Sequence, residues 1–436
     1  MYPITNEQLL SALSERAISR LTDATIRQIC AVAANLEQQS GEPMIHLELG
    51  NPGLPATKIG VEAEIEALHS GVSNKYPVID GIPPLKKAGQ KFVKAFLDVD
   101  IKPGNVIPTV GSMQGSFTLM LLLKHRDVRK DTMLFINPGF QAQPTQAYIL
   151  GLKQQSFDLY NYRGKKLEEK LEEILSKGNV TGLLYSNPNN PAWTNLTDEE
   201  LEIIGRMATK HDVIVLEDLA YMGMDFRTDL SRPYEPPFVS TVAKYTDNYI
   251  LMISGSKIFS YAGQRIAIVC ISDKVAAHNY QAVNEFFSLP TFVDAYIYGV
   301  LYAVSSGTTH SAQFALAAML DSAADGKLNF INECKEYGRR GELAKKAFTE
   351  NGFSIVYALD GNEPIGDGFF FTASYPGLDS ENLLRELLRY GVAAITLPAT
   401  GSEQEGIRVC VSMLDSDEKF EILNKRLKTF NNDHKV

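Results

Sequence analysis

The stretch Tyr249-Ile250-Leu251-Met252-Ile253-Ser254-Gly255-Ser256-Lys257 joins a short apolar run to two serines and a lysine. The apolar part predicts a buried β-strand, which places Lys257 at the carboxyl end of that strand. Burying a lysine there is costly unless its amine has a partner or a reaction to perform. Arg265 follows closely, and this set of groups suits an anionic aldehyde, because the amine can condense with the aldehyde while the others bind a phosphate. An exposed lysine after an ordinary strand would show the same short pattern.

Apolar runs alternate with helical stretches between about residues 106 and 271. These runs lie at 133–136, 182–185, 213–216 and 266–269. The alternation predicts an α/β fold, in which helices cover both faces of a mainly parallel sheet. After about residue 330, long charged helices with a few strands predict a smaller α+β domain.

The composition is that of an ordinary soluble globular protein, with 44% hydrophobic and 22% charged residues in a chain of 436. A chain of this length is expected to form two domains. The net charge of −10, without a basic block, argues against nucleic acid or a membrane surface as the main partner. The four cysteines lack zinc-ligand spacing, so no metal is expected. Neither a signal peptide nor an apolar run of membrane-spanning length is evident, which predicts a cytoplasmic protein.

Polar or aromatic residues follow several predicted strands, at the sheet edge where open parallel sheets bind ligands. Gly111-Ser112-Met113 forms a turn that opens a helix and offers N–H groups to a phosphate, although many such turns carry glycine for geometry alone. Phe140 follows the strand at 133–136 and either stacks on a flat ring or fills the core. Asn190 begins the second of two Asn-Pro steps, which project amide side chains at this loop. Asp218, in the segment 217–221, ends an apolar strand and either caps a helix or pairs with a cation such as a protonated ring nitrogen.

In this order, each after a strand, the segments resemble the fold type I, class I/II family of pyridoxal-phosphate-dependent aminotransferases, from about residue 46 to 415. The resemblance implies pyridoxal phosphate as cofactor and a seven-stranded, mainly parallel sheet between helices. It also implies a division into 1–65 (arm and part of the small domain), 66–325 (large cofactor-binding domain) and 326–436 (rest of the small domain).

The resemblance also implies roles for single residues. Lys257 would hold the cofactor covalently and later move the substrate proton, and Asp218 would pair with the ring nitrogen. Asn190 and Tyr221 would hydrogen-bond the phenolic oxygen, and Phe140 would stack on the ring. The phosphate would be bound by residues at two strand ends: Gly111, Ser112, Met113, Ser254 and Arg265.

Further matches lie outside the central strands. Tyr76 resembles the tyrosine that reaches the phosphate of the neighbouring subunit, which implies a homodimer with shared sites. Arg408, in Gly406-Ile407-Arg408-Val409, resembles the arginine that clamps the substrate α-carboxylate, with Asn190 beside it. Gly50 and Asn51 resemble the loop that closes over the amino acid.

The segment Asn190-Pro191-Ala192-Trp193 departs from the usual Asn-Pro-Thr-Gly and puts the only tryptophan near the expected cofactor. The hypothesis is amino transfer between an L-α-amino acid and a 2-oxo acid by a ping-pong mechanism. One alternative is a C–S β-lyase, or a related elimination or decarboxylation enzyme with the same residue set. Another is a non-catalytic sensor, which the short segment before His46 disfavours because it is small for a DNA-binding domain.

Overall fold

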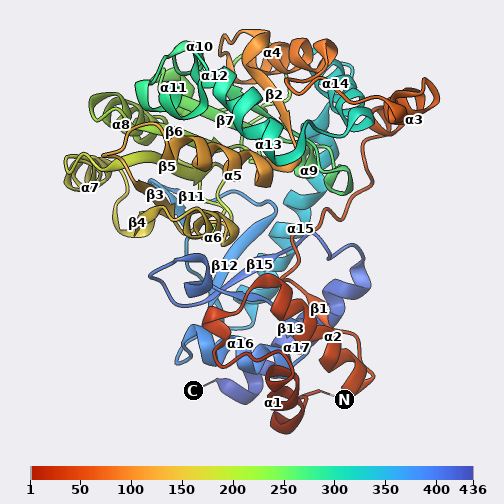
Figure 1. Cartoon of the computed structure of the whole chain (residues 1–436). Helices are drawn as coiled ribbons and strands as arrows, with labels where there is room; N and C mark the ends of the chain where they lie inside the picture. Colours follow the sequence, from red (N-terminus) through yellow and green to blue (C-terminus); the bar gives the residue numbers. More distant parts are fainter. Residues whose placement is uncertain (1, 436) are drawn as a thin grey trace.

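The computed structural model describes residues 2–435, whose strands form one seven-stranded sheet, one four-stranded sheet and two strand pairs (Figure 1). All neighbouring strands of the large sheet are parallel except at β8, which is antiparallel to both of its neighbours. The predicted α/β fold with a seven-stranded, mainly parallel sheet is therefore confirmed. In spatial order the strands are β2 (Val106–Thr109), β8 (Ala267–Ile271), β7 (Tyr249–Ser254), β6 (Ile214–Asp218), β5 (Val180–Ser186), β3 (Thr132–Asn137) and β4 (Lys153–Asp158).

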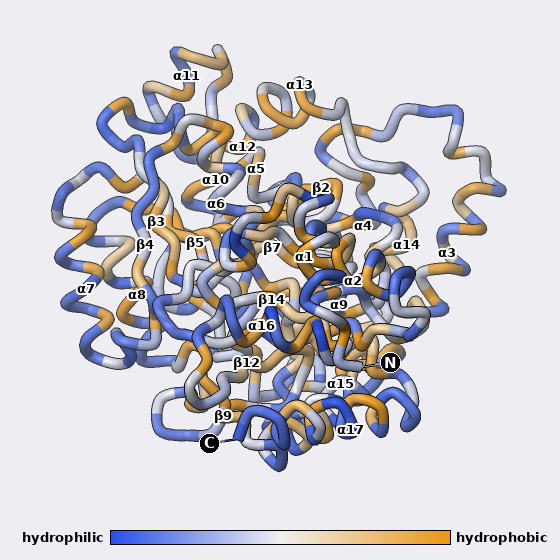
Figure 2. The backbone as a smooth tube through the Cα atoms, turned by 90° about the horizontal axis from the view of Figure 1, so that it is seen from below, coloured by the Kyte–Doolittle hydropathy of each residue, from blue (hydrophilic) through white to orange (hydrophobic). Residues whose placement is uncertain are grey.

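Helices bury both faces of this sheet. Successive side chains of a strand point to opposite faces, so neighbouring apolar residues of one strand pack on different groups of helices. Leu134 and Leu251 pack on the side of one group of helices, whereas Met133 and Met252 pack on the other side. Figure 2 shows the apolar strands β3, β5 and β7 inside the molecule. The first group of helices is α4 (Pro83–Leu97), α7 (Lys165–Leu175), α8 (Asp198–Lys210) and α14 (His310–Ala324). The second is α5 (Gly111–Lys124), α6 (Ala142–Ile149) and the segments between Asp273 and Leu301.

The N-terminal arm shares a hydrophobic core with the C-terminal part of the chain, and Figure 1 places both chain ends there. Leu9 and Leu36 of the arm pack with Leu384 and Phe430. The four-stranded antiparallel sheet has the order β14 (Ile395–Thr396), β15 (Ile407–Cys410), β12 (Phe370–Ser374) and β9 (Ser354–Ile355). The other elements here are α1 (Asn6–Ser14), α2 (Ile26–Ser40), β1 (Ile45–His46), β13 (Val392–Ala393), α15 (Phe330–Glu350), α16 (Ser380–Arg389) and α17 (Asp417–His434). The predicted domain boundaries stay a prediction.

The remaining α-helices, the π-helix and one antiparallel strand pair complete the fold. They are α3 (Lys58–His69), α9 (Gly255–Ile258), α10 (Asp273–Ala277), α11 (Gln281–Phe287), α12 (Phe292–Asp294), a π-helix (Ala295–Leu301), α13 (Tyr302–Ser305), β10 (Leu359–Asp360) and β11 (Glu363–Pro364). One helical stretch, Gln281–Ser305, is long and apolar enough to cross a membrane by length and composition alone, which corrects the expectation of no such run. It is weak evidence for a membrane, because the stretch bends at Ser288, whose φ is +56°, and at Pro290. The cytoplasmic location stays a prediction.

Candidate active site

Asp218 is almost fully buried at the edge of the sheet where β5, β6 and β7 end. The register pairs it with Ser186 of β5 and Met252 of β7. Its carboxylate accepts hydrogen bonds from Gln143 Nε2 at 3.0 Å and from the Ala220 N–H at 3.2 Å. Burial raises the pKa of Asp218 to about 6, because within residues 2–435 no nearby positive charge offsets the burial. The carboxylate is therefore suited to a cationic group of a ligand.

Lys257 lies in α9, which begins directly after β7. Its Nζ donates a hydrogen bond to the Gly50 carbonyl oxygen and lies 5.2 Å from the centroid of the Phe369 ring. Burial lowers the pKa of Lys257 to about 8, and the positive charges of Arg408 and Arg265 lower it further. An amine with this pKa is partly unprotonated near neutral pH, so it can act as a nucleophile.

Arg265 and Gly111 meet at the same sheet edge. Ala267 of β8 pairs with Ser254 of β7 and with Thr109 of β2, so the two neighbouring strand ends lie on either side of it. Gly111 has a φ of +66°, and a Cβ there would lie 2.5 Å from a terminal nitrogen of Arg265. Only glycine therefore lets the guanidinium lie against the start of α5.

The first turn of α5 carries the backbone N–H groups of Gly111, Ser112 and Met113. Such groups have no partner inside the helix, and the helix dipole favours an anion at this end. The exposed Arg265 guanidinium donates one hydrogen bond to the Ala262 carbonyl oxygen at 2.8 Å and has further N–H groups. Together these groups fit a phosphate.

Arg408 lies on β15 and is 2% exposed. It donates hydrogen bonds to the Glu48 carbonyl oxygen and, at 3.5 Å, to Asn190 Oδ1, while its Nε has no partner among the described residues. The guanidinium lies 5.0 Å from the centroid of the Phe370 ring. A buried guanidinium with an unused N–H group suits a carboxylate ligand.

Tyr221 joins these groups through an aromatic cluster. Its ring centroid lies 5.4 Å from that of Phe369 and 5.3 Å from that of Phe370. These two phenylalanines are the rings that Lys257 and Arg408 face. Tyr221 therefore packs on both rings that the two cationic groups face.

The segment from Glu48 to Gly53 contacts the same two cationic residues. The carbonyl oxygen of Glu48 accepts from Arg408, and that of Gly50 accepts from Lys257. The N–H of Gly53 donates to the Tyr337 hydroxyl at 3.0 Å. The loop predicted to close over the substrate thus lies against the site.

Trp193 is fully buried, although its backbone is in the left-handed region with a φ of +62°. Its ring lies edge-on to Tyr221 at 5.7 Å and to Phe370 at 6.1 Å. Its indole also packs on Gly368, where a Cβ would overlap the atoms Cζ2, Cε2 and Nε1. Trp193 therefore links the loop of Asn190 to the segment that carries Phe370.

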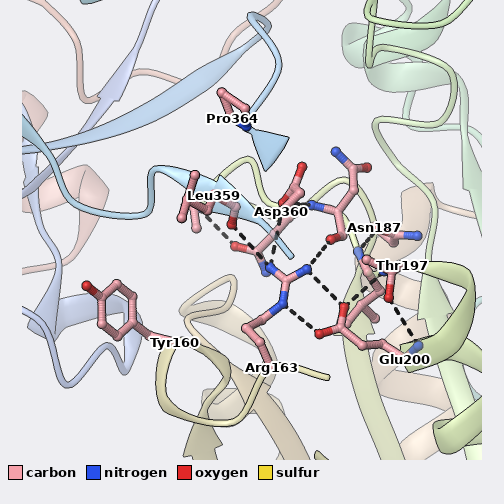
Figure 3. A network of polar contacts seen from close by, with 12 residues as sticks. Tyr160, Arg163, Asn187, Thr197, Glu200, Leu359, Asp360 and Pro364 are labelled. Carbon is pink, nitrogen blue, oxygen red and sulfur yellow. Dashed lines mark hydrogen bonds and ion pairs between the residues drawn. The ribbon is translucent and has the colours of Figure 1, made fainter. Parts of the chain in front are cut away.

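A polar network fastens the hairpin β10–β11 to the large sheet, and Figure 3 shows it from close by. Arg163 forms a two-point ion pair with Glu200, at 2.7 and 2.9 Å, and lies 3.6 Å from Asp360. Asp360 also accepts from the Asn195 N–H at 2.8 Å and from Arg227 at 2.7 Å. The hairpin is thereby held beside the loop that contains Trp193.

Three predicted site residues are less closely tied to this arrangement. Phe140 is half-buried after β3, and its carbonyl oxygen accepts from the Gln143 N–H. Asn51 is exposed next to Gly50. Tyr76 is 92% exposed, and within residues 2–435 the structure does not bring it into contact with the other predicted site residues.

Several residues of the site were missed by the sequence analysis. Gln143 carried a usable signal, because it lies three residues after Phe140 in the same strand-end segment. Glu48 lies only two residues before the predicted Gly50 and was still missed. The others come from segments distant in sequence and gave no local signal: Tyr337, Phe369 and Phe370.

Comparisons with known proteins agree on one family. The profile described as aminotransferase class I and II matches residues 42–426. The LL-diaminopimelate aminotransferase of Natranaerobius thermophilus is 24% identical over 377 residues, which cover 85% of this chain and 87% of that protein. The (5-formylfuran-3-yl)methyl phosphate transaminase of Methanocaldococcus jannaschii is 26% identical over 413 residues, covering 93% and 96%. The solved structure of Thermus thermophilus aspartate aminotransferase with maleate has a TM-score of 0.74 at 21% identity, covering 96% and 99%.

Proposed function

Because the chain belongs to the class I and II aminotransferase family, whose members depend on pyridoxal phosphate, we propose that it moves an amino group between an L-α-amino acid and a 2-oxo acid by a ping-pong mechanism. The observation that carries the proposal is the pair of buried groups at one sheet edge. Lys257 has an amine of lowered pKa, and Asp218 has a carboxylate without a cationic partner among the described residues. An aldehyde on a protonated aromatic ring would satisfy both.

The residues present fit pyridoxal phosphate at each of its polar positions. When bound, the cofactor supplies a ring that accepts the electrons released at the substrate Cα. Asp218 would hold the ring nitrogen protonated, and that positive charge would in turn keep the carboxylate ionised. Asn190 and Tyr221 would hydrogen-bond the phenolic oxygen, and Phe140 would stack on the ring. The phosphate would be held by Gly111, Ser112, Met113, Ser254 and Arg265.

Lys257 would bond covalently to the cofactor aldehyde at rest and hold or move a proton at Nζ during the reaction. Its lowered pKa supports this role, since a fully protonated amine could not accept a proton. Arg408, with Asn190 beside it, would bind the α-carboxylate of the substrate. The loop of Gly50 and Asn51 would exclude water over the bound amino acid.

We further propose a homodimer in which Tyr76 reaches the site of the partner subunit. Residues 75–77 lie beside the segment that follows α13, because His310 Nδ1 is 3.3 Å from the Lys75 carbonyl oxygen. That segment borders α5, where Gln114 donates to Ser305 at 3.0 Å. Tyr76, 92% exposed, and Tyr302, 59% exposed, are large side chains next to residues of these contacts, and a subunit interface would cover them. Sedimentation would test the dimer, and mixing Tyr76→Ala with Lys257→Ala subunits should restore activity in hybrids if the sites are shared.

An absorbance titration tests the proposed function. The purified protein with pyridoxal phosphate should show a visible band that an amino donor converts to a near-ultraviolet band and a 2-oxo acid restores. Lys257→Ala should lack this visible band, because the band depends on the covalent bond between the Lys257 amine and the cofactor aldehyde. Pyruvate and ammonia in place of a stoichiometric 2-oxo acid would point to the lyase alternative. No visible band in the wild type would refute the assignment of Lys257.

A further inference from the structure

Glu48, next to Arg408, has a buried carboxylate that the proposed reaction does not use. Glu48 is fully buried; its Oε1 lies 2.8 Å from His46 Nδ1, while its Oε2 has no partner among the described residues. A buried carboxylate oxygen without a partner is costly, so its presence calls for a nearby charge or function. The nearby positive charge is Arg408, whose Nε also lacks a partner in residues 2–435.

Glu48 and Arg408 are linked in two ways. The Glu48 backbone carbonyl oxygen accepts a hydrogen bond from the Arg408 guanidinium. The Glu48 carboxylate also favours the charged form of Arg408 electrostatically, although within residues 2–435 no ion pair within 4.0 Å joins the two side chains. The charge of Arg408 is thus partly balanced by a carboxylate that forms no ion pair with it, and the Arg408 Nε–H stays without a partner among the described residues.

His46 connects this buried carboxylate to the solvent. The His46 side chain is 26% exposed, and its Nε2 lies 3.4 Å from Oε1 of Glu37, whose side chain is 33% exposed. The hydrogen bond and charge of Glu48, with a contribution from Glu37, raise the pKa of His46 above its usual 6.5, against the effect of burial. Protons can therefore reach the dyad of His46 and Glu48 from outside.

The charged and titratable groups around this dyad are few. From α2 they are Cys30, Arg27 and Glu37, and from β15 the group is Arg408. Glu37 in turn interacts with Tyr2 and with Arg426 of α17, the helix that packs against β1. Burial and the Glu48 carboxylate raise the pKa of Cys30 to about 11, so this thiol stays neutral near neutral pH. His46 is therefore the group facing Glu48 that changes charge in the range around neutrality.

We propose that Glu48 is a positioning residue that acts as the built-in counter-charge of Arg408, and that protonation of His46 sets how strongly Arg408 binds the carboxylate of a substrate. Protonated His46 neutralises Glu48 and leaves the charge of Arg408 available to the ligand. Neutral His46 leaves Glu48 as an uncompensated negative charge that opposes an entering carboxylate. Carboxylate affinity should therefore fall as the pH rises through the pKa of His46. This inference rests on the role proposed for Arg408.

The test is the dissociation constant of propanoate for the protein with bound pyridoxal phosphate, measured by calorimetry between about pH 6 and pH 9. Propanoate has no amine, so the titration of a substrate amino group does not enter. The wild type should lose about three- to tenfold in affinity across this range. Glu48→Gln should bind propanoate more tightly by a similar factor at about pH 9, with the ratio to wild type shrinking at low pH. His46→Gln should bind weakly at all pH values, because Glu48 then stays uncompensated.

Controls separate this inference from the proposed function. Glu421→Gln, which removes an exposed carboxylate of α17, should leave the affinity within twofold of the wild type. Arg408→Gln should abolish propanoate binding; if it does not, or if the wild type binds no propanoate, the proposed clamp fails. Binding that depends on Arg408 but has the wild-type pH profile in Glu48→Gln would overturn the inference alone. If Glu48→Gln does not fold, a wild-type profile in His46→Gln overturns it equally.

Discussion

Gly368 has no room for a side chain, because the indole of Trp193 occupies the place of its Cβ. The backbone cannot move away easily, since a Cβ on Gly341 of α15 would lie 2.8 Å from the Gly368 carbonyl oxygen on another side. Gly368 is not in the left-handed region, so alanine is compatible with its backbone. We therefore expect Gly368→Ala to destabilise the protein by about 2–3 kcal/mol, through overpacking alone.

Trp193→Ala removes a fully buried indole and should cost about 3–5 kcal/mol by itself. The space that it leaves is the space that a Cβ on Gly368 requires, so the double variant should be no less stable than Trp193→Ala. The coupling energy of this double-mutant cycle is then about 2–3 kcal/mol. Because residue 193 has a φ of +62°, Trp193→Gly should be about 1 kcal/mol more stable than Trp193→Ala.

Urea unfolding followed by far-ultraviolet circular dichroism measures these values, since the variants with Trp193 replaced lack the only tryptophan and its fluorescence. Gly104→Ala is a matched control, because no atom lies within 4 Å of a Cβ at residue 104. It should change the free energy of unfolding by less than about 1 kcal/mol. Additive losses in the double variant would show that the two residues do not compete for one space.

Three further variants test other parts of the structure. Glu217→Gln should stabilise the protein by up to about 3 kcal/mol above about pH 7 and hardly at pH 4, which thermal unfolding at several pH values measures. Burial raises the pKa of Glu217 to about 7 in the folded protein, so the wild type loses stability as the pH rises from the pKa of the unfolded chain to this folded-state pKa. Asp218→Asn should likewise stabilise the cofactor-free protein above about pH 6, where the carboxylate with a pKa of about 6 is charged, yet bind pyridoxal phosphate more weakly in a fluorescence titration. Asp360→Asn should speed proteolysis at the hairpin 359–364 without altering the visible band, because Arg163 and Arg227 lose their shared partner; an unchanged cleavage rate would contradict this.

The sheet, and the edge at which the candidate site residues gather, could be predicted because their signals are local. An apolar run followed by a polar residue marks a strand end, and parallel strands place these ends at one edge. Lys257, Asp218 and Ser254 were found in this way, and the register brings their strands together. Tertiary packing determines which residues of other segments reach this edge. The Phe370 ring faces Arg408 because β12 pairs with β15 in the small sheet.

Glu217 and Asp218 show where prediction from the sequence stops. Both carboxylates end the same apolar strand, and burial alone would make each of them require a cation. Adjacent side chains of a strand point to opposite faces, so the two groups meet different surroundings. Glu217 is satisfied by the hydroxyls of Tyr185 at 3.2 Å and Thr241 at 2.5 Å and by the Val242 N–H at 3.2 Å. The sequence alone does not show these partners, because Tyr185 comes from the neighbouring strand β5 and Thr241 lies more than twenty residues later in the chain. They leave Asp218 as the buried carboxylate of the candidate site.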